Sequence, residues 1–216
     1  MFNLLALFST EEIVVMVSVL VILLTFAIAF IIGKKKTFIS TKKIAVVALA
    51  ISLTTTLSFL KFSLPFGGSI TVFSLVPVIL VAYAYGVYYG LLTGVVTGLI
   101  QFITSPYILT PLTFFLDYIF AFSAICFAGI LKNVIKNRTA SMALGCVIFY
   151  LVRFTMHVLS GIIYFNSGYI TEGFPADNAL IYSICYNAVY VLPDMLIALI
   201  FILPFSRNKS FIDNLQ

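Results

Sequence analysis

Long, uninterrupted apolar segments are the feature that most restricts how this chain can fold. They recur throughout the 216 residues, of which 62% are hydrophobic and only 9% are charged. Soluble domains carry about a quarter charged residues, so a soluble globular fold is excluded. A helix needs about 20 apolar residues to cross a bilayer, whereas barrel strands alternate over about ten. The sequence therefore predicts an all-α membrane protein, a polytopic helical bundle in the lipid bilayer.

Seven apolar segments are predicted to be membrane spans. The first is expected to be retained, because it follows Glu11 and Glu12 and lacks the basic start and small-residue cleavage site of a signal peptide. Pro77, Pro193 and Pro204 are expected to kink or shorten their spans. The segments cover roughly residues 13–32, 44–60, 70–83, 86–102, 112–131, 142–164 and 180–203.

The basic residues predict how the chain is oriented. Ten of the twelve fall in loops that share one side of a seven-span bundle, which the positive-inside rule places in the cytoplasm. The plasma membrane would then carry the N-terminus outside and the C-terminus inside. Because the charges cluster between spans, they indicate topology and no nucleic-acid partner. The ten residues are Lys34, Lys35, Lys36, Lys42, Lys43, Lys132, Lys136, Arg138, Arg207 and Lys209.

Polar side chains interrupt the apolar sequence most densely between Arg153 and Asn187. A four-residue spacing from Arg153 to Phe165 predicts one lined helix face, with polar groups of the next span opposite it. Asp117 is expected to face the interior, because a carboxylate is costly against lipid. We predict a pocket open to the exterior, suited to a flat heteroaromatic ligand that can carry a positive charge. Its predicted residues are Asp117, Arg153, His157, Gly161, Phe165, Tyr182, Tyr186 and Asn187.

Two alternatives stay open for these ionisable groups. Asp117 and Arg153 could instead form a buried ion pair that only fixes the register of two helices. Asp194, about two turns beyond Asn187, could be either a structural partner or a ligand contact.

The sequence predicts neither an enzyme nor a cofactor. There is one histidine and no HExxH, GxSxG or Walker A motif, so zinc-protease, serine-hydrolase and ATPase chemistry have no recognisable residues. Cys126, Cys146 and Cys185 lack CxxC or metal-ligand spacing and are expected to be buried packing residues. No metal site is predicted.

Three groups of small residues predict close approaches of the backbone. A glycine ridge at Gly86, Gly90, Gly94 and Gly98 is expected to pack against neighbouring helices. After Pro65, the segment Gly67, Gly68 and Ser69 breaks the helix and is predicted to be a lid over the pocket, because irregular backbone at membrane depth lies against a cavity. The stripe Ala45, Ala48 and Ser52 could contact either the bundle or a partner.

Four patches, in order between about residues 43 and 203, together resemble a known family. They are Leu64–Thr71 leading into Ser74–Pro77; Gly90–Gly94 with Gly98–Phe102; Leu116–Tyr118 with Ala121–Phe122; and Arg153–Gly161 followed by Tyr182–Ser183 and Tyr186–Asn187. The chain resembles the thiamine-specific substrate-binding subunits (S-components) of the ThiT/YuaJ family, which belong to energy-coupling factor (ECF) vitamin transporters.

The resemblance implies a fold, partners and residue roles. The fold would be a six-helix S-component core at residues 37–206, an extra N-terminal transmembrane helix with a basic loop at 1–36, and a cytoplasmic tail at 207–216. The subunit would dock through Ala45, Ala48 and Ser52 onto an ECF transmembrane coupling protein with two cytoplasmic ATPase subunits. Asp117 would contact thiamine; His157, Tyr182 and Asn187 would hydrogen-bond it; Phe165 would stack on it; Tyr118, Arg153 and Gly161 would line the pocket.

One departure from the family leaves the ligand open. The family often holds its ligand between tryptophans, and this chain has none. One alternative is therefore an S-component for a thiamine precursor or another vitamin. A second, which rests on the ionisable residues within the membrane, is a stand-alone proton-coupled carrier with a relay through Asp117, His157 and Asp194.

Overall fold

The structure, a computed structural model, describes residues 20, 27, 31, 40–65, 68–168, 178–208 and 210. The chain divides into two compact units, residues 1–37 and 38–216, and the second contains the long helices together with a short hairpin. Most of the predicted first span, residue Gly67 of the predicted lid and most of the predicted tail lie outside the described residues.

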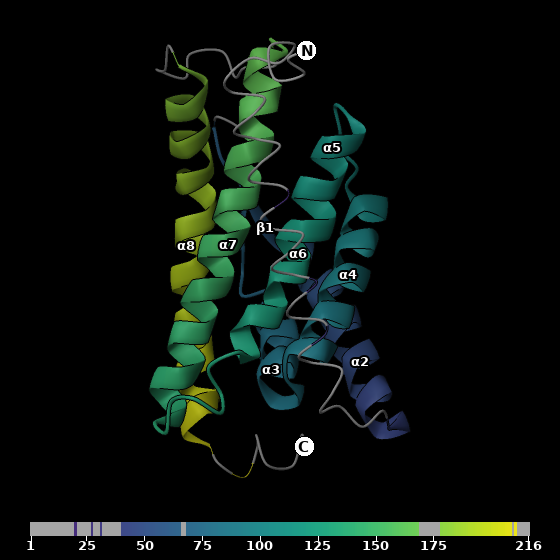
Figure 1. The fold of residues 1–216 in the computed structure, drawn as a ribbon, viewed down its shortest axis with the longest axis vertical. Coiled ribbons are helices and arrows are strands. Elements are labelled where there is room, and N and C mark those ends of the chain that lie inside the picture. Colours follow the sequence, from purple (N-terminus) through teal and green to yellow (C-terminus); the bar gives the residue numbers. More distant parts are fainter. Residues whose placement is uncertain are drawn as a thin grey trace, which may run out of the picture. The chain divides into compact units, whose positions relative to one another are not determined.

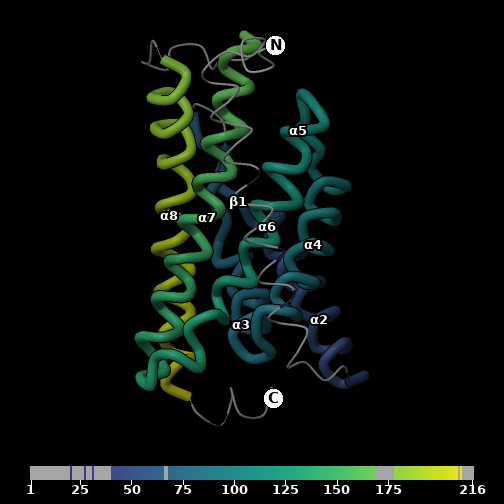
Figure 2. Tube along the Cα trace, viewed as in Figure 1, coloured from purple at the N-terminus to yellow at the C-terminus, as the bar shows by residue number. Residues whose placement is uncertain are grey.

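Helices make up most of the described chain (Figures 1 and 2). Many of their large apolar side chains point outward: Leu49 is 70% exposed, Ile103 76% and Ile200 67%. Such surfaces are stable only against another apolar medium, which supports the expectation of a membrane bundle. Among the described residues, five helical segments are long and apolar enough to cross a bilayer; α3 (Val76–Tyr85) is shorter. The five are α2 (Thr41–Ser58), α4 (Val87–Thr104), Pro111–Gly129, α7 (Arg138–Asn166) and α8 (Ala179–Arg207).

A two-stranded hairpin stands where the third predicted span was expected to begin. Strand β1 (Lys61–Ser63) pairs antiparallel with β2 (Ser69–Thr71), and α3 starts only at Val76. The prediction of a span over residues 70–83 is therefore wrong at its start. Pro77 does not kink this helix but lies in its first turn, where the missing N–H is no loss.

The fifth predicted span is a single apolar segment with changing helical geometry. It consists of α5 (Pro111–Phe114), the π-helix η2 (Phe115–Phe120), α6 (Ala121–Ser123) and the 3-10 helix η3 (Ala124–Gly129). π-helical turns are rare and are frequent at functional sites. Asp117 lies in this turn.

The glycines of α4 let the segment Pro111–Gly129 pack very close to this helix. A Cβ added at Gly94 would lie 2.4 Å from the Phe122 carbonyl oxygen, and one at Gly98 would lie 2.1 Å from that of Tyr118. The predicted packing role is thus confirmed there and at Gly90. Gly86 differs, because a Cβ would meet nothing within 4 Å; its φ of +87° places it in the turn between α3 and α4.

Helices α7 and α8 lie side by side and run in opposite directions (Figure 1). Each starts at an asparagine whose side-chain oxygen accepts a backbone N–H bond: Asn137 caps α7 and Asn178 caps α8. Pro193 and Pro204 lie inside α8 and do not end it. Arg138 at the start of α7 and Arg207 at the end of α8 therefore share one end of this helix pair.

Candidate ligand-binding site

A cavity of about 770 Å³ opens among the hairpin, α4, η2, α7 and α8. Its size is that of a small-molecule site. Its wall on α7 extends from Arg153 to Tyr164 and that on α8 from Tyr182 to Asp194. Because the two helices are antiparallel, the cavity lies toward the end opposite Arg138 and Arg207.

An acid and an imidazole meet at one side of the cavity. The Asp117 carboxylate lies 2.8 Å from His157 Nδ1 and accepts a hydrogen bond of 2.5 Å from Ser160 Oγ. When this carboxylate is ionised, Nδ1 is the donor and Nε2 of the neutral ring can only accept. Nε2 is buried and has no hydrogen-bond partner among the described residues. The His157 ring lines the cavity, and its Nε2 is an acceptor that the described residues leave unused.

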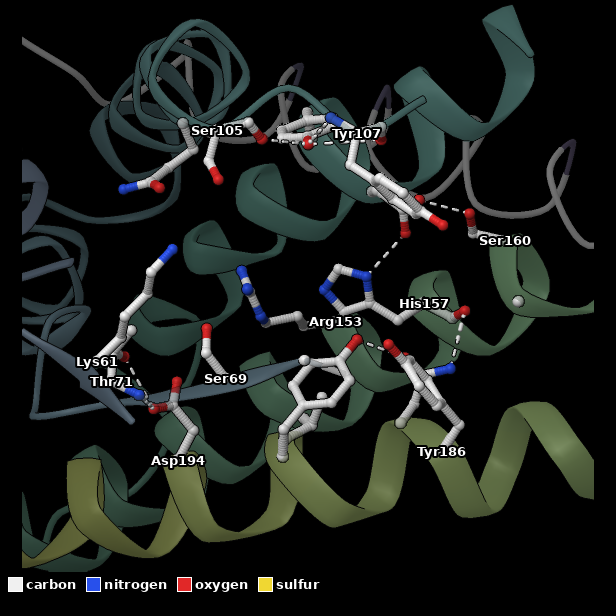
Figure 3. Close-up of a pocket in the computed structure, with 18 of the residues that line it drawn as sticks. Lys61, Ser69, Thr71, Ser105, Tyr107, Arg153, His157, Ser160, Tyr186 and Asp194 are labelled. Atoms are coloured by element: carbon white, nitrogen blue, oxygen red, sulfur yellow. Dashed lines mark hydrogen bonds and ion pairs between the residues drawn. The ribbon is translucent and has the colours of Figure 1, made fainter. Parts of the chain in front are cut away.

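Arg153 lies one turn before His157 on α7 and does not pair with Asp117. Its guanidinium carbon lies 4.3 Å from the centre of the Phe122 ring, a cation–π distance. Its Nη1 atom is buried without a hydrogen-bond partner in the described structure. Figure 3 shows Arg153 and His157 side by side in the middle of the cavity. The alternative of an Asp117–Arg153 register pair is not what the structure shows.

Two pairs of stacked tyrosines supply aromatic faces. The Tyr182 and Tyr186 rings are 5.7 Å apart and nearly parallel, and the Tyr107 and Tyr164 rings are 5.2 Å apart. All four residues line the cavity. Tyr118 holds the loop that carries Tyr107, because its hydroxyl accepts from the Tyr107 N–H and donates to a loop carbonyl, each at 2.8 Å.

Asn187 joins the two helices on which the site stands. Its Nδ2 donates to the His157 carbonyl at 3.1 Å and to the Ser183 carbonyl at 2.8 Å, and its Oδ1 accepts from the Tyr190 hydroxyl. The amide is thus occupied within the bundle. Gly161 makes room for this contact, because a Cβ there would lie 2.1 Å from Ser183 Oγ.

Comparison with known proteins now places the chain in a family. Residues 44–212 match the model of the family described as Thiamine transporter protein (Thia_YuaJ). The chain belongs to this family. It is 33% identical over 178 residues to the thiamine transporter ThiT of Bacillus subtilis (strain 168), covering 78% of this chain and 90% of that one. The fold matches that of ThiT from Listeria monocytogenes with a TM-score of 0.68, at 22% identity, over 79% of this chain and 96% of the other.

Family membership confirms several predictions. The resemblance inferred from the four patches holds, and the chain is a multi-pass membrane transport protein, not an enzyme. The helical membrane fold is confirmed by the structural match, although the described chain also contains the hairpin.

Phe165 is the one predicted site residue that does not line the cavity. Steps of four residues advance a helix by about 40° more than a full turn, so the three steps from Arg153 rotate Phe165 by about 120°. Its ring instead lies 5.3 Å from that of Tyr182 and packs on a small cluster with Val158 and Ile162. The other eight predicted residues all line the cavity.

Several residues that line the cavity were not predicted from the sequence. Ser160, three residues after His157, and Tyr190, three after Asn187, could have been found from helical spacing. Tyr107 stands in a loop and Lys61 in a strand, where no periodic signal exists. Of the predicted lid, Gly68 and Ser69 line the cavity.

Two further predictions concern small residues away from the cavity. Ala45, Ala48 and Ser52 are exposed on α2, so within the described chain they make no packing ridge against the bundle. Cys126 and Cys146 are buried as predicted, but Cys185 lies on the exposed side of α8, so that prediction is wrong for this residue.

Substituting Gly161 by alanine is expected to weaken ligand binding and stability together. The new methyl would push Ser183 away and disturb the Asn187 amide, whose Nδ2 would lie 3.2 Å from it. Overpacking of this kind costs about 1–3 kcal/mol. Thermal unfolding in detergent and a binding titration would check this. Unchanged values for both would contradict the close α7–α8 contact.

Proposed function

We propose that the chain is the substrate-binding subunit of an ECF-type transporter, which captures thiamine outside the cell and passes it to an ATP-driven coupling module. Family membership supports the ligand. The observation that carries the proposal concerns two buried nitrogens, His157 Nε2 and Arg153 Nη1, of residues that line the cavity beside Asp117. Neither has a hydrogen-bond partner among the described residues. Buried polar atoms are normally hydrogen-bonded, so a ligand that reaches these two nitrogens would supply hydrogen bonds that the described residues do not provide.

The chemistry of thiamine fits the groups that line the cavity. Its aminopyrimidine ring offers an exocyclic N–H donor to His157 Nε2 and acceptor atoms to Arg153. Its thiazolium ring carries a positive charge, which Asp117 and the faces of the tyrosine pairs favour. Tyrosines thereby take the place of the tryptophans that this chain lacks.

Charge supports an outward-facing cavity. Arg138 and Arg207 lie at the end of α7 and α8 opposite the cavity, and the positive-inside rule assigns that end to the cytoplasm. The exposed stripe Ala45, Ala48 and Ser52 on α2 gives a neighbouring helix close access to the backbone. We propose this stripe as the surface for the ECF transmembrane coupling protein, which works with two cytoplasmic ATPases.

Calorimetry tests the ligand. Purified protein in detergent is expected to bind thiamine with measurable heat at micromolar concentration. Competition with the separate pyrimidine and thiazole halves would distinguish thiamine from a precursor as the preferred ligand. Absence of heat from folded protein would contradict the proposal.

The stand-alone proton-coupled carrier is less well supported by the geometry. Its relay needs Asp194 to communicate with His157, but Asp194 hydrogen-bonds to Thr71 and Tyr150 instead. In liposomes with a pH gradient, we expect no thiamine uptake by this protein alone and uptake once the coupling module and ATP are present. Uptake without the module would favour the carrier.

A further inference from the structure

The hairpin of β1 and β2 forms a non-helical wall of the cavity. Lys61 and Ser63 of β1 and Ser69 and Thr71 of β2 all line it. Each strand has only three residues, and an isolated two-stranded hairpin is marginally stable at best in water. Contacts with the helices must therefore fix where this wall stands.

The hydrogen-bonded contact between the hairpin and α8 is made by Asp194. Its Oδ1 accepts from the Thr71 backbone N–H at 3.0 Å and from Thr71 Oγ1 at 2.9 Å. Its Oδ2 accepts from the Tyr150 hydroxyl of α7 at 3.4 Å. One carboxylate thus joins α7, α8 and β2, and Figure 3 shows its contact with Thr71. A carboxylate within a membrane helix is costly unless such partners hold it.

Two apolar contacts flank this carboxylate on the same side of α8. The Tyr190 ring lies against Gly68, where an added Cβ would be only 2.8 Å from Cδ1. The Phe201 ring lies 4.2 Å from that of Phe73, just after β2. Spacings of four and seven residues place Tyr190, Asp194 and Phe201 along one face of the helix.

The same helix face reaches the ligand-binding groups. The Tyr190 hydroxyl donates to Asn187 Oδ1, and its ring lies edge-on to His157 at 6.0 Å. Consecutive turns of α8 therefore carry both the residues that contact the hairpin and the residues that line the cavity.

We infer that Asp194 is a positioning residue, which acts through Thr71 to hold the hairpin wall in place and thereby slows dissociation of the ligand. It does so without being needed for the contacts of Asp117 and His157 with the ligand. The identity of the ligand, thiamine, rests on the proposed function. The anchoring of the hairpin by the contact of Asp194 with Thr71 does not.

The test combines dissociation kinetics with amide hydrogen exchange on the full chain. Asp194→Ala is expected to raise the dissociation rate of radiolabelled thiamine about tenfold, in line with the loss of charge-assisted hydrogen bonds. Asp194→Asn keeps an acceptor and should raise it less. Exchange at residues 69–72 should speed up in both variants even without ligand, with α4 unchanged.

Thr71→Val supplies a second variant should Asp194→Ala fold poorly. It should also raise the dissociation rate, whereas Thr155→Val should not, because the exposed Thr155 hydroxyl bonds only to the Leu151 carbonyl of its own helix. Because Asp194 acts through Thr71, thiamine should dissociate no faster from the variant that combines Asp194→Ala and Thr71→Val than from Asp194→Ala alone.

The outcomes separate the anchor from the ligand. Unchanged dissociation and unchanged exchange at residues 69–72 in Asp194→Ala would overturn the inference, as would fully additive effects of the Asp194 and Thr71 substitutions. If the unsubstituted protein does not bind thiamine, the proposed function fails, and the exchange experiment still decides whether Asp194 anchors the hairpin.

Discussion

Replacing Asp117 by alanine is expected to abolish measurable thiamine binding. The substitution removes the negative charge beside the cavity and leaves His157 Nδ1 and Ser160 Oγ without their acceptor. Losing one partner of a buried charge pair between a protein and its ligand costs about 2–5 kcal/mol, which is roughly one to four orders of magnitude in Kd. The imidazole would also lose the contact that fixes its tautomer, so Nε2 would no longer be a defined acceptor. Calorimetric titration measures this loss.

Cys185→Ala is the control for this substitution. The residue is an exposed cysteine of α8 that does not line the cavity, so binding should stay nearly unchanged. Circular dichroism of both variants would confirm that they fold. Equal losses of affinity in the two variants would place the binding site elsewhere.

Gly98→Ala is expected to have the second-largest effect, through stability. An added Cβ would lie 2.1 Å from the carbonyl oxygen of Tyr118, and backbone cannot move aside as a flexible side chain can. Overpacking costs about 1–3 kcal/mol, and the strain falls next to Asp117 in the π-helical turn. We therefore expect a lower midpoint of thermal unfolding in detergent, together with weaker thiamine binding.

Val96→Ala provides the comparison on the same helix. Val96 is 42% exposed, so shortening it should change neither the unfolding midpoint nor binding by much. A Gly98→Ala protein as stable as the Val96→Ala protein would contradict the close packing of α4 against the π-helical turn.

Much of the fold could be predicted because a bilayer leaves few choices. Apolar length located α7 and α8 to within a few residues of their observed ends, and the glycine ridge of α4 showed where another backbone would pass. Length alone could not reveal the hairpin, because β2 at Ser69–Thr71 carries no charge and runs on into the apolar sequence of α3. Nor could it show the change to π-helical geometry at Asp117, in a turn that packs against Gly98.

The candidate site was predictable where its residues share a helix face. His157, Gly161 and Asn187 lie on facing turns of α7 and α8, as their spacing indicates. Phe165 does not line the cavity, because a four-residue repeat rotates gradually around the helix. Contacts between residues of different elements could not be assigned. The sequence left open an ion pair of Asp117 with Arg153, whereas in the structure Asp117 contacts His157 and Ser160. The Asp194–Thr71 contact spans 123 positions of sequence, beyond any local pattern.

We propose that the cavity beside Asp117 and His157 holds thiamine. Mass spectrometry of the protein purified from its native membrane, without added ligand, tests it most directly. We predict one bound molecule with the mass of thiamine in the unsubstituted protein and none in the Asp117→Ala variant. A different bound molecule, or thiamine retained equally by both proteins, would contradict the assignment of this cavity to thiamine.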